Sequence, residues 1–281
     1  MLKFSPANAK IEALAKVESI AVYLEDGRKV YSLDLLSGYS CPFAQDCLAK
    51  VVVKDNKRTI KDGPAAQLRC FSASQEVVYT NVYNSRKHNF DALRPLTKAE
   101  MIESIQSSMP HDLGVCRIHV AGDFFNQDYF DAWIEVARNN PGRLFYAYTK
   151  SVRYWVNRLY DIPENLVLTA SEGGREDYLI EQYKLRYAKV VFSVQQATEL
   201  GLEIDHTDEH AANPQTRYTS FGLLIHGVQP KGSEASEALK VLKKEGVKHS
   251  YSRSVGSGKS PLTGGAGPAG PPLMGGLLLV G

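Results

Sequence analysis

The strongest constraint on the fold of this 281-residue chain is the alternation of strand and helix patterns through its middle. Short apolar stretches typical of strands alternate with amphipathic stretches typical of helices, over residues 115–124, 127–140, 143–151, 152–160, 165–171, 175–186 and 188–194. Such alternation with short turns is typical of parallel strands joined by helical crossovers. It predicts an α/β fold of repeated βα units, in a parallel sheet or a partial barrel. Ligand chemistry in such folds gathers at the carboxyl ends of the strands.

The residues before this alternation predict an N-terminal layer that is rich in β-structure. Residues 18–36 have the pattern of a hairpin, and residues 51–64 that of a second, more exposed one. Helices are predicted over 72–93 and 97–108, and the second opens with the Thr-x-x-Glu spacing of a capping box. A last amphipathic helix is predicted over 233–246.

The end of the chain has a different composition. Gly and Pro dominate residues 254–281, and no apolar period could build a core there. We therefore expect a single α/β domain over 1–253 and a disordered tail over 254–281. The "GSGKS" in this tail is not a phosphate-binding loop, because Arg253 stands where the first glycine of that motif belongs and no strand precedes it.

Composition sets limits on the class of protein. With 43% hydrophobic and 23% charged residues, the chain has ordinary globular composition. A net charge of +2 gives no global reason to expect nucleic acid, although local basic patches stay possible. The sequence shows no signal peptide and no apolar run of membrane-spanning length. We expect a cytoplasmic protein without membrane partners, in which cysteines stay reduced.

Three of the four cysteines lie in or beside stretches that contain Gly, Pro or Ser and are typical of loops: Cys41, Cys47 and Cys70. Three thiolates leave one position of a four-coordinate centre open, as in iron–sulfur clusters that bind a substrate or cofactor. A zinc site would need a fourth ligand, which His88 or His119 could supply. These cysteines could also be small buried residues without a metal. Cys116 sits in an apolar strand and is expected in the core.

Polar side chains end three consecutive predicted strands: Asp123, Lys150 and Glu172. Together with His119 they are the candidate catalytic residues. His119 is expected on the same face of one strand as Asp123, deeper in the sheet. Asp123 could instead cap the following helix, although Asn126 would cap it equally well, and His119 could be a satisfied core residue. Gly173 and Gly174 would let backbone approach a ligand closely.

Two further patterns carry weaker hypotheses. Residues 206–210 spell H-x-x-E-H, the inverted zinc-protease signature, which needs a long helix. Because a strand end and Pro214 flank it, we predict a polar loop there, from which His206 and His210 could add ligands at the same edge. The mixture of aromatic residues and Arg in "RYWVNRLY" could stack nucleic-acid bases, but at helical spacing it is more typical of core and surface packing.

Several separate stretches resemble one known family: "GYSCPFAQDCLAK", "RCFSASQEVVYTNVYNSRKHNFD", "RIHVAGDFFNQDYFDAWIEVARNNPGRLFYAYTKS" and "IDHTDEHAA". They are similar to the phage gene-product-eighty-eight family over roughly residues 18–253. The resemblance implies a phage or prophage origin, and hence the host cytoplasm, but carries no assigned reaction.

A cysteine loop, a "GDF" after a strand and βα units are also distantly similar to radical S-adenosylmethionine enzymes. That resemblance implies that Gly122 and Asp123 stand where a Gly-Gly-Glu-type strand end holds the cofactor's amino group. The C-x5-C spacing with a distant third cysteine departs from the compact C-x3-C-x2-C motif of most such enzymes.

Three hypotheses follow. The leading one is a phage-type iron–sulfur protein, in its most concrete form a radical S-adenosylmethionine-like enzyme with the three loop cysteines as ligands. The first alternative is a zinc-stabilised nucleic-acid-binding protein. The second is a metal-free interaction protein.

Overall fold

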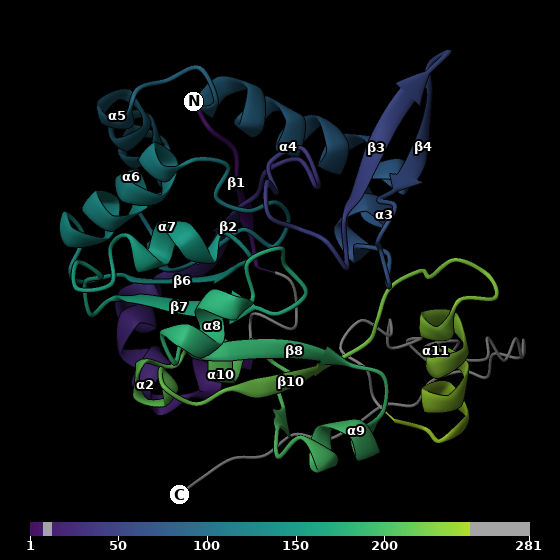
Figure 1. Cartoon of the computed structure of the whole chain (residues 1–281). Coiled ribbons are helices and arrows are strands. Elements are labelled where there is room, and N and C mark those ends of the chain that lie inside the picture. The colour runs from purple at the N-terminus through teal and green to yellow at the C-terminus, as the bar shows by residue number, and fades with distance from the viewer. Residues whose placement is uncertain (8–12, 248–281) are drawn as a thin grey trace, which may run out of the picture. The chain divides into compact units, whose positions relative to one another are not determined.

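The computed structural model describes residues 1–7 and 13–247. The tail predicted over 254–281 therefore lies outside the described residues. The centre of the fold is an eight-stranded sheet (Figure 1). Its strands, in spatial order, are β1 (Phe4–Pro6), β2 (Lys29–Leu33), β5 (Leu113–Ile118), β6 (Leu144–Thr149), β7 (Leu166–Ser171), β8 (Tyr187–Val191), β10 (Phe221–Leu224) and β9 (Glu203–Ile204). All neighbours pair in parallel except β1, which runs antiparallel to β2. The predicted α/β fold with a mostly parallel sheet is confirmed.

Helices and 3₁₀ turns connect these strands. The α-helices are α2 (Glu18–Ala21), α3 (Phe71–Val78), α4 (Thr80–Leu93), α5 (Lys98–Ser108), α6 (Gln127–Arg138), α7 (Val152–Val156), α8 (Tyr178–Gln182), α9 (Val194–Glu199), α10 (Glu209–Ala212) and α11 (Glu234–Lys244). The 3₁₀ segments are η1 (Ala13–Lys16), η2 (Val22–Gly27) and η3 (Pro214–Thr216). The capping box predicted for α5 is present, since Thr97 and Glu100 bond reciprocally. Within the described part of the chain, no helix is both long and apolar enough to cross a membrane.

The order of the parallel strands decides where a site can lie. Strands β2, β5, β6, β7, β8 and β10 follow one another in space as they do along the chain. A doubly wound sheet reverses this order at a switch point, whereas a βα barrel does not. Over these six strands the order is therefore that of a barrel segment. Their carboxyl ends meet at one edge.

Both faces of the sheet are buried, which explains why its strands are apolar almost throughout. In β6, Phe145 and Ala147 belong to the core cluster under α5 and α6, which also contains Trp133. Leu144 and Tyr146 point to the opposite face, into a cluster that includes residues of η1, α2 and α10. Successive side chains of a strand alternate between faces, so one short strand serves two cores.

The predicted hairpin over residues 18–36 is wrong in its first half. Residues 18–27 form α2 and η2, and only Lys29–Leu33 is a strand. The backbone of η2 packs directly on β5, because a Cβ added to Gly114 would lie 2.0 Å from the carbonyl oxygen of Tyr23. The position beside β2 that a hairpin strand would take is filled by β1 and β5. Tertiary packing thus overrides the local β-propensity of "VYL".

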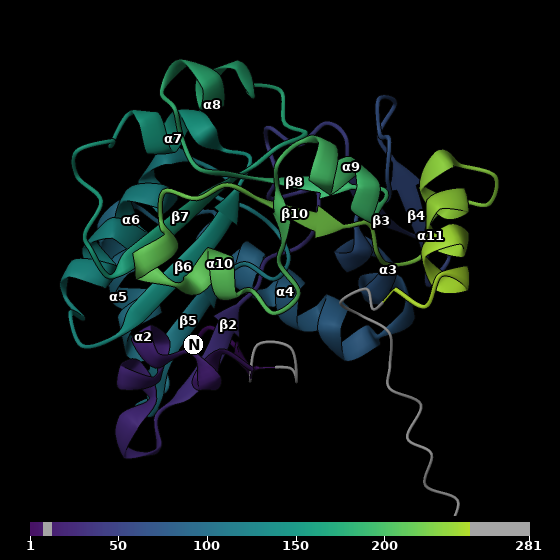
Figure 2. The same cartoon turned by 90° about the horizontal axis from the view of Figure 1, so that it is seen from below.

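The second predicted hairpin is confirmed as a separate two-stranded sheet, β3 (Ala49–Lys54) and β4 (Lys57–Asp62). Its two-residue turn has left-handed backbone at Asp55 (φ 49°) and Asn56 (φ 59°), as a type I′ turn requires. Figures 1 and 2 show the hairpin beside α3. Ala49 and Val51 pack there in a small cluster.

Candidate functional site

A cavity lies at the carboxyl ends of the parallel strands. It has a volume of about 430 Å³ and is lined by residues that end or follow β5, β6, β7, β8 and β10. The loop after β2 and the segment before α3 close its other side. This is the edge at which βα folds place their ligands.

The three loop cysteines line this cavity: Cys41, Cys47 and Cys70. Burial raises the pKa of Cys41 well above its ordinary value, and the negative charges of Asp123, Cys70 and Cys47 raise it further. Burial also raises the pKa of Cys47 to about 11, against the lowering effect of the Lys150 charge. The charges of Cys47 and Cys70 therefore act on Cys41. Cys116 is instead fully buried in β5, as predicted.

The side chains do not form a compact ligand set for one metal ion. Among residues 1–7 and 13–247, no group of three or more His, Cys, Asp or Glu side chains is placed to hold such an ion. His88, a predicted zinc ligand, does not line the cavity but contacts the carbonyl of Met1 through Nε2 at 3.0 Å. The four-ligand zinc site with His88 is therefore not assembled in this structure.

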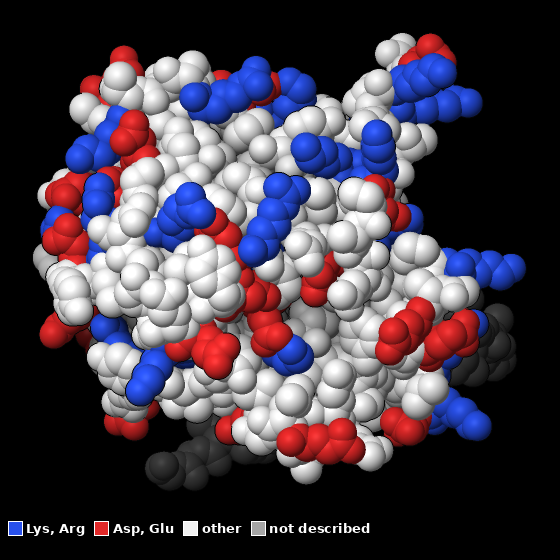
Figure 3. Space-filling model, viewed as in Figure 1, with Lys and Arg blue, Asp and Glu red and all other residues white. Residues whose placement is uncertain are grey.

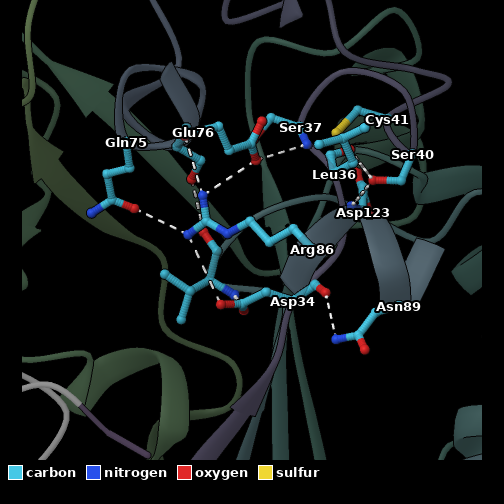
Figure 4. A network of polar contacts seen from close by, with 12 residues as sticks. Asp34, Leu36, Ser37, Ser40, Cys41, Gln75, Glu76, Arg86, Asn89 and Asp123 are labelled. Carbon is cyan, nitrogen blue, oxygen red and sulfur yellow. Dashed lines mark hydrogen bonds and ion pairs between the residues drawn. The ribbon is translucent and has the colours of Figure 1, made fainter. Parts of the chain in front are cut away.

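The segment between β2 and β3 carries Cys41 and Cys47, and we call it the cysteine loop. Its first half is held by a buried polar network (Figure 4). The backbone N–H and the hydroxyl of Ser37 donate to Glu76 Oε1, at 3.1 and 2.7 Å. Arg86 pairs with the same oxygen at 3.2 Å. The Ser40 hydroxyl accepts the backbone N–H of Asp123 at 3.3 Å. The residues just before Cys41 are thus tied to both α3 and the segment after β5.

The second half of the loop is held by the two glycines after β7. The backbone N–H of Asp46 donates to Gly173 O at 3.0 Å, and Ala44 forms a β-bridge with Gly174. Gly173 has φ +98°, and a Cβ there would lie 3.1 Å from the Asp46 side chain. The two glycines were predicted to let backbone approach a ligand closely. In this structure they let the backbone of the cysteine loop approach closely. Gly173 also lines the cavity, and Gly174 does not.

Asp123 joins the ends of β5 and β6. Its Oδ1 accepts from Phe124 N at 2.7 Å and from the Thr149 hydroxyl at 2.6 Å, and its Oδ2 accepts from Lys150 N at 2.8 Å. Burial raises its pKa to about 6, although these bonds oppose the shift. Asp123 does not cap α6, because Asn126 does so through Tyr129 N at 2.8 Å. A carboxylate offers about four acceptor positions, so Oδ2 keeps one for a ligand.

His119 lines the cavity, but not in the predicted way. Strand β5 ends at Ile118, and His119 has left-handed backbone (φ 68°), so His119 and Asp123 do not alternate along one strand. Its Nε2 lies 3.1 Å from the Tyr129 hydroxyl, and its Nδ1 has no hydrogen-bond partner among the described residues. Burial, helped by the Arg117 charge, lowers its pKa to about 3, so the ring is neutral near pH 7.

Lys150 and Glu172 complete the predicted set at the cavity. The Lys150 ammonium donates to Ser171 O at 2.9 Å, to Ser171 Oγ at 3.0 Å and to Glu172 O at 2.5 Å. The Glu172 carboxylate forms an ion pair with Lys189, which also lines the cavity. All four candidate catalytic residues therefore meet at one cavity.

The sequence reasoning did not identify a buried ion pair in the cavity wall. Arg117 pairs with Asp208, which also accepts the Tyr146 hydroxyl at 3.1 Å. The Arg117 guanidinium also lies 5.1 Å from the centre of the Tyr148 ring. The presence of a charged residue, Arg117, inside the otherwise apolar strand "VCRIHV" could have indicated that it has a buried partner.

Asp208 belongs to the H-x-x-E-H stretch, whose histidines do not line the cavity. His210 Nε2 pairs with Glu203 at 3.2 Å. The helix there, α10, has only four residues, so the predicted absence of a peptidase helix is confirmed for this segment.

The fold and the cavity define an α/β protein with a cysteine-bearing site at the carboxyl edge of a consecutively ordered parallel sheet. The chain belongs to the Gene product 88 family, whose model matches residues 2–244. It is 29% identical to the Gene 88 protein of Mycobacterium phage L5 over 122 residues, which cover 40% of this chain and 44% of that protein.

It is 28% identical to the Gene 88 protein of Mycobacterium phage D29 over 122 residues, 40% of this chain and 43% of that protein. The aligned stretch thus spans less than half of either relative. No solved structure matches the chain. The family is a phage family, as the sequence resemblance predicted, and the similarity to radical S-adenosylmethionine enzymes stays a prediction.

Proposed function

We propose that this phage-family protein is an iron–sulfur enzyme of the radical S-adenosylmethionine type. The observation that supports the proposal is the convergence of Cys41, Cys47 and Cys70 on one cavity at the carboxyl edge of the sheet. Cys41 and Cys47 share a loop, whereas Cys70 comes from beyond the β3–β4 hairpin. Burial of small residues requires no such convergence beside a cavity.

A cluster and a single ion would use the three thiols differently. Around one zinc ion every thiolate binds the same centre, at about 2.3 Å. In a cluster each thiolate binds a different iron, so the sulfurs lie farther apart. In the proposed site, Cys41, Cys47 and Cys70 would each bind a different iron of one cluster. When bound there, the reduced cluster would supply an electron to the sulfonium of S-adenosylmethionine.

The chain's own residues have two roles in this proposal. Burial raises the pKa of Cys47 to about 11, and the Lys150 charge opposes part of that rise and so favours the thiolate that a metal needs. Asp123 keeps one acceptor position at the cavity, which suits an ammonium group such as the amino group of S-adenosylmethionine. Its contacts to Thr149 and Lys150 fix that carboxylate against rotation.

Metal analysis of anaerobically purified protein tests the proposal. Cys41→Ala, Cys47→Ala and Cys70→Ala should each remove most of the bound iron and the visible absorbance. A thiolate is a soft ligand that alanine cannot replace. Cys116→Ala is the matched control, because Cys116 lies in the core of β5 and should keep the iron.

The outcomes separate the alternatives. Equal iron in all four variants, or no iron in the parent protein, overturns the iron–sulfur assignment. Zinc lost from the same three variants would instead indicate a structural metal. If iron is present, S-adenosylmethionine should raise the melting temperature, because a ligand that binds only the folded state stabilises it. An unchanged melting temperature at millimolar ligand would contradict that part of the proposal.

A further inference from the structure

One face of the β3–β4 hairpin carries four lysines. Residues directly opposite each other in this antiparallel pair lie on the same face, and successive residues alternate between faces. The register therefore places three opposed pairs on one face, which we call the lysine face: Lys50 with Lys61, Val52 with Thr59, and Lys54 with Lys57.

The other face of the hairpin is fixed to the body of the protein. Ala49 and Val51 are buried against α3. The Arg58 guanidinium donates to Val77 O at 3.3 Å and to the Thr80 hydroxyl at 2.6 Å. These contacts leave Lys54, Lys57 and Lys61 exposed, while Lys50 is half-buried with its ammonium 5.1 Å from the centre of the Tyr39 ring. Figure 3 shows Lys and Arg side chains gathered over this hairpin.

The lysine face concentrates charge that the hairpin does not neutralise. The hairpin, residues 49–62, holds five basic side chains and two acidic ones, a net +3, whereas the whole chain has only +2. Like charges placed directly opposite each other destabilise a strand pair. Yet within the described part of the chain, none of the four lysines forms an ion pair with an acidic side chain. Such a surface is complementary to an extended anion.

We propose that the lysine face binds the phosphodiester backbone of nucleic acid. Lys50 and Lys54 are four residues apart on β3, so the two lysine pairs are separated by about 13 Å. Measured along the helix axis, the phosphates of one duplex strand advance by about 3.4 Å per nucleotide, so about 13 Å of axis holds about four of them. A two-stranded β-ribbon also fits the major groove.

The composition of the face favours nucleic acid over a lipid surface. Amphipathic segments that lie in a bilayer interface insert apolar side chains beside their cations. On the lysine face, Val52 is the only apolar residue, and it is half-buried. The proposal does not involve the cysteines, so it goes beyond the proposed cluster chemistry and does not depend on it.

Fluorescence anisotropy with a labelled 20-base-pair duplex, and with one of its single strands, tests the proposal. The test variant replaces the four lysines of the face with glutamine: K50Q, K54Q, K57Q and K61Q. The matched control removes the same charge from four exposed lysines elsewhere: K98Q, K231Q, K243Q and K244Q. Both are compared with the wild type from 50 to 200 mM salt. Circular dichroism checks the fold of each variant.

The wild type should bind with a steep salt dependence. Each phosphate contact that is lost should reduce the slope of log K against log salt by about 1, so the test variant should lose about 3 to 4. At 50 mM salt its affinity should fall on the order of 100-fold or more, because four phosphate contacts are removed. The double variants K50Q/K61Q and K54Q/K57Q should each lose about half of the slope, and they keep the test valid if the quadruple variant does not fold.

Three results would overturn the proposal. The first is the absence of binding by the wild type at 50 mM salt. The second is an equal loss in test and control variants, which would indicate an effect of net charge alone. The third is binding to vesicles of anionic phospholipid but to neither oligonucleotide. A preference between duplex and single strand identifies the form of backbone that the face binds.

Discussion

His119→Asn tests whether the neutral, buried imidazole at the cavity is a feature of the folded state. Asparagine does not titrate, and it tolerates the left-handed backbone that this position adopts. The folded-state pKa of His119 is lowered to about 3 by burial and by the Arg117 charge, whereas an unfolded histidine has about 6.5. As the pH falls below 6.5, His119 binds a proton in the unfolded chain but stays neutral in the folded protein. Stability is therefore lost as the pH falls from about 6.5 toward 3.

The size of the effect follows from these two pKa values. Between pH 7.5 and pH 5, His119 should cost the wild type about 2 kcal/mol of unfolding free energy, at 1.36 kcal/mol per pKa unit. Asp123 acts in the opposite direction, because its folded-state pKa of about 6 is raised, so its contribution to stability increases as the pH falls from 6 to 3.8. Both proteins contain Asp123, so its effect cancels in their difference.

Urea unfolding followed by tryptophan fluorescence at pH 7.5 and pH 5 provides the measurement. Loss of the contact to Tyr129 should lower the stability of the variant by about 1–3 kcal/mol at both pH values. On top of that offset, the wild type should lose about 2 kcal/mol more than the variant between the two pH values. His88→Asn is the matched control, because His88 is exposed on α4 and does not line the cavity. Equal losses in wild type and His119→Asn would refute the reasoning.

Three further changes test the supports of the site. Gly122→Ala should destabilise the protein by on the order of 3 kcal/mol and lower its iron content. The reason is that φ is +90° at this position and the new Cβ would lie 2.6 Å from Ser40 Oγ. An unchanged free energy of unfolding would show that the loop around Ser40 can move to accommodate the methyl group. Glu76→Ala should cost about 3–5 kcal/mol in urea unfolding, since it leaves Arg86 buried without its closest carboxylate; a cost below 1 kcal/mol would mean that water reaches the network. Asn126→Ala should cost only about 1 kcal/mol and keep the iron, as loss of an N-cap does; a loss of iron would link α6 to the site.

Local sequence determined the elements whose stability is local. The capping box at Thr97 and the turn at Asp55 and Asn56 depend on contacts within a few residues. The apolar stretches of the βα units are likewise recognisable from the local pattern of residues. Because parallel strands end at a common edge, the same pattern also predicted that Lys150 and Glu172 would lie near each other. These features could be read without knowing any long-range contact.

Tertiary structure alone decided which side chains meet and how. Residues 18–27 are helical because they pack over Gly114, far away in sequence. Arg117 forms an ion pair with Asp208, which lies 91 positions away in the sequence. Cys70 reaches the loop of Cys41 only because the β3–β4 hairpin returns the chain to the cavity.

The backbone conformation at the ends of the strands could not be predicted from the sequence for the same reason. Periodicity predicted that β5 continues through His119, but the chain turns there in a left-handed conformation. The turn allows Asp123 to accept bonds from Thr149 and Lys150 of the neighbouring strand. The periodicity of a sequence indicates which face of a helix or strand is buried. The partner of a polar side chain is instead set by contacts between distant segments, and these contacts form only when the whole sheet is assembled.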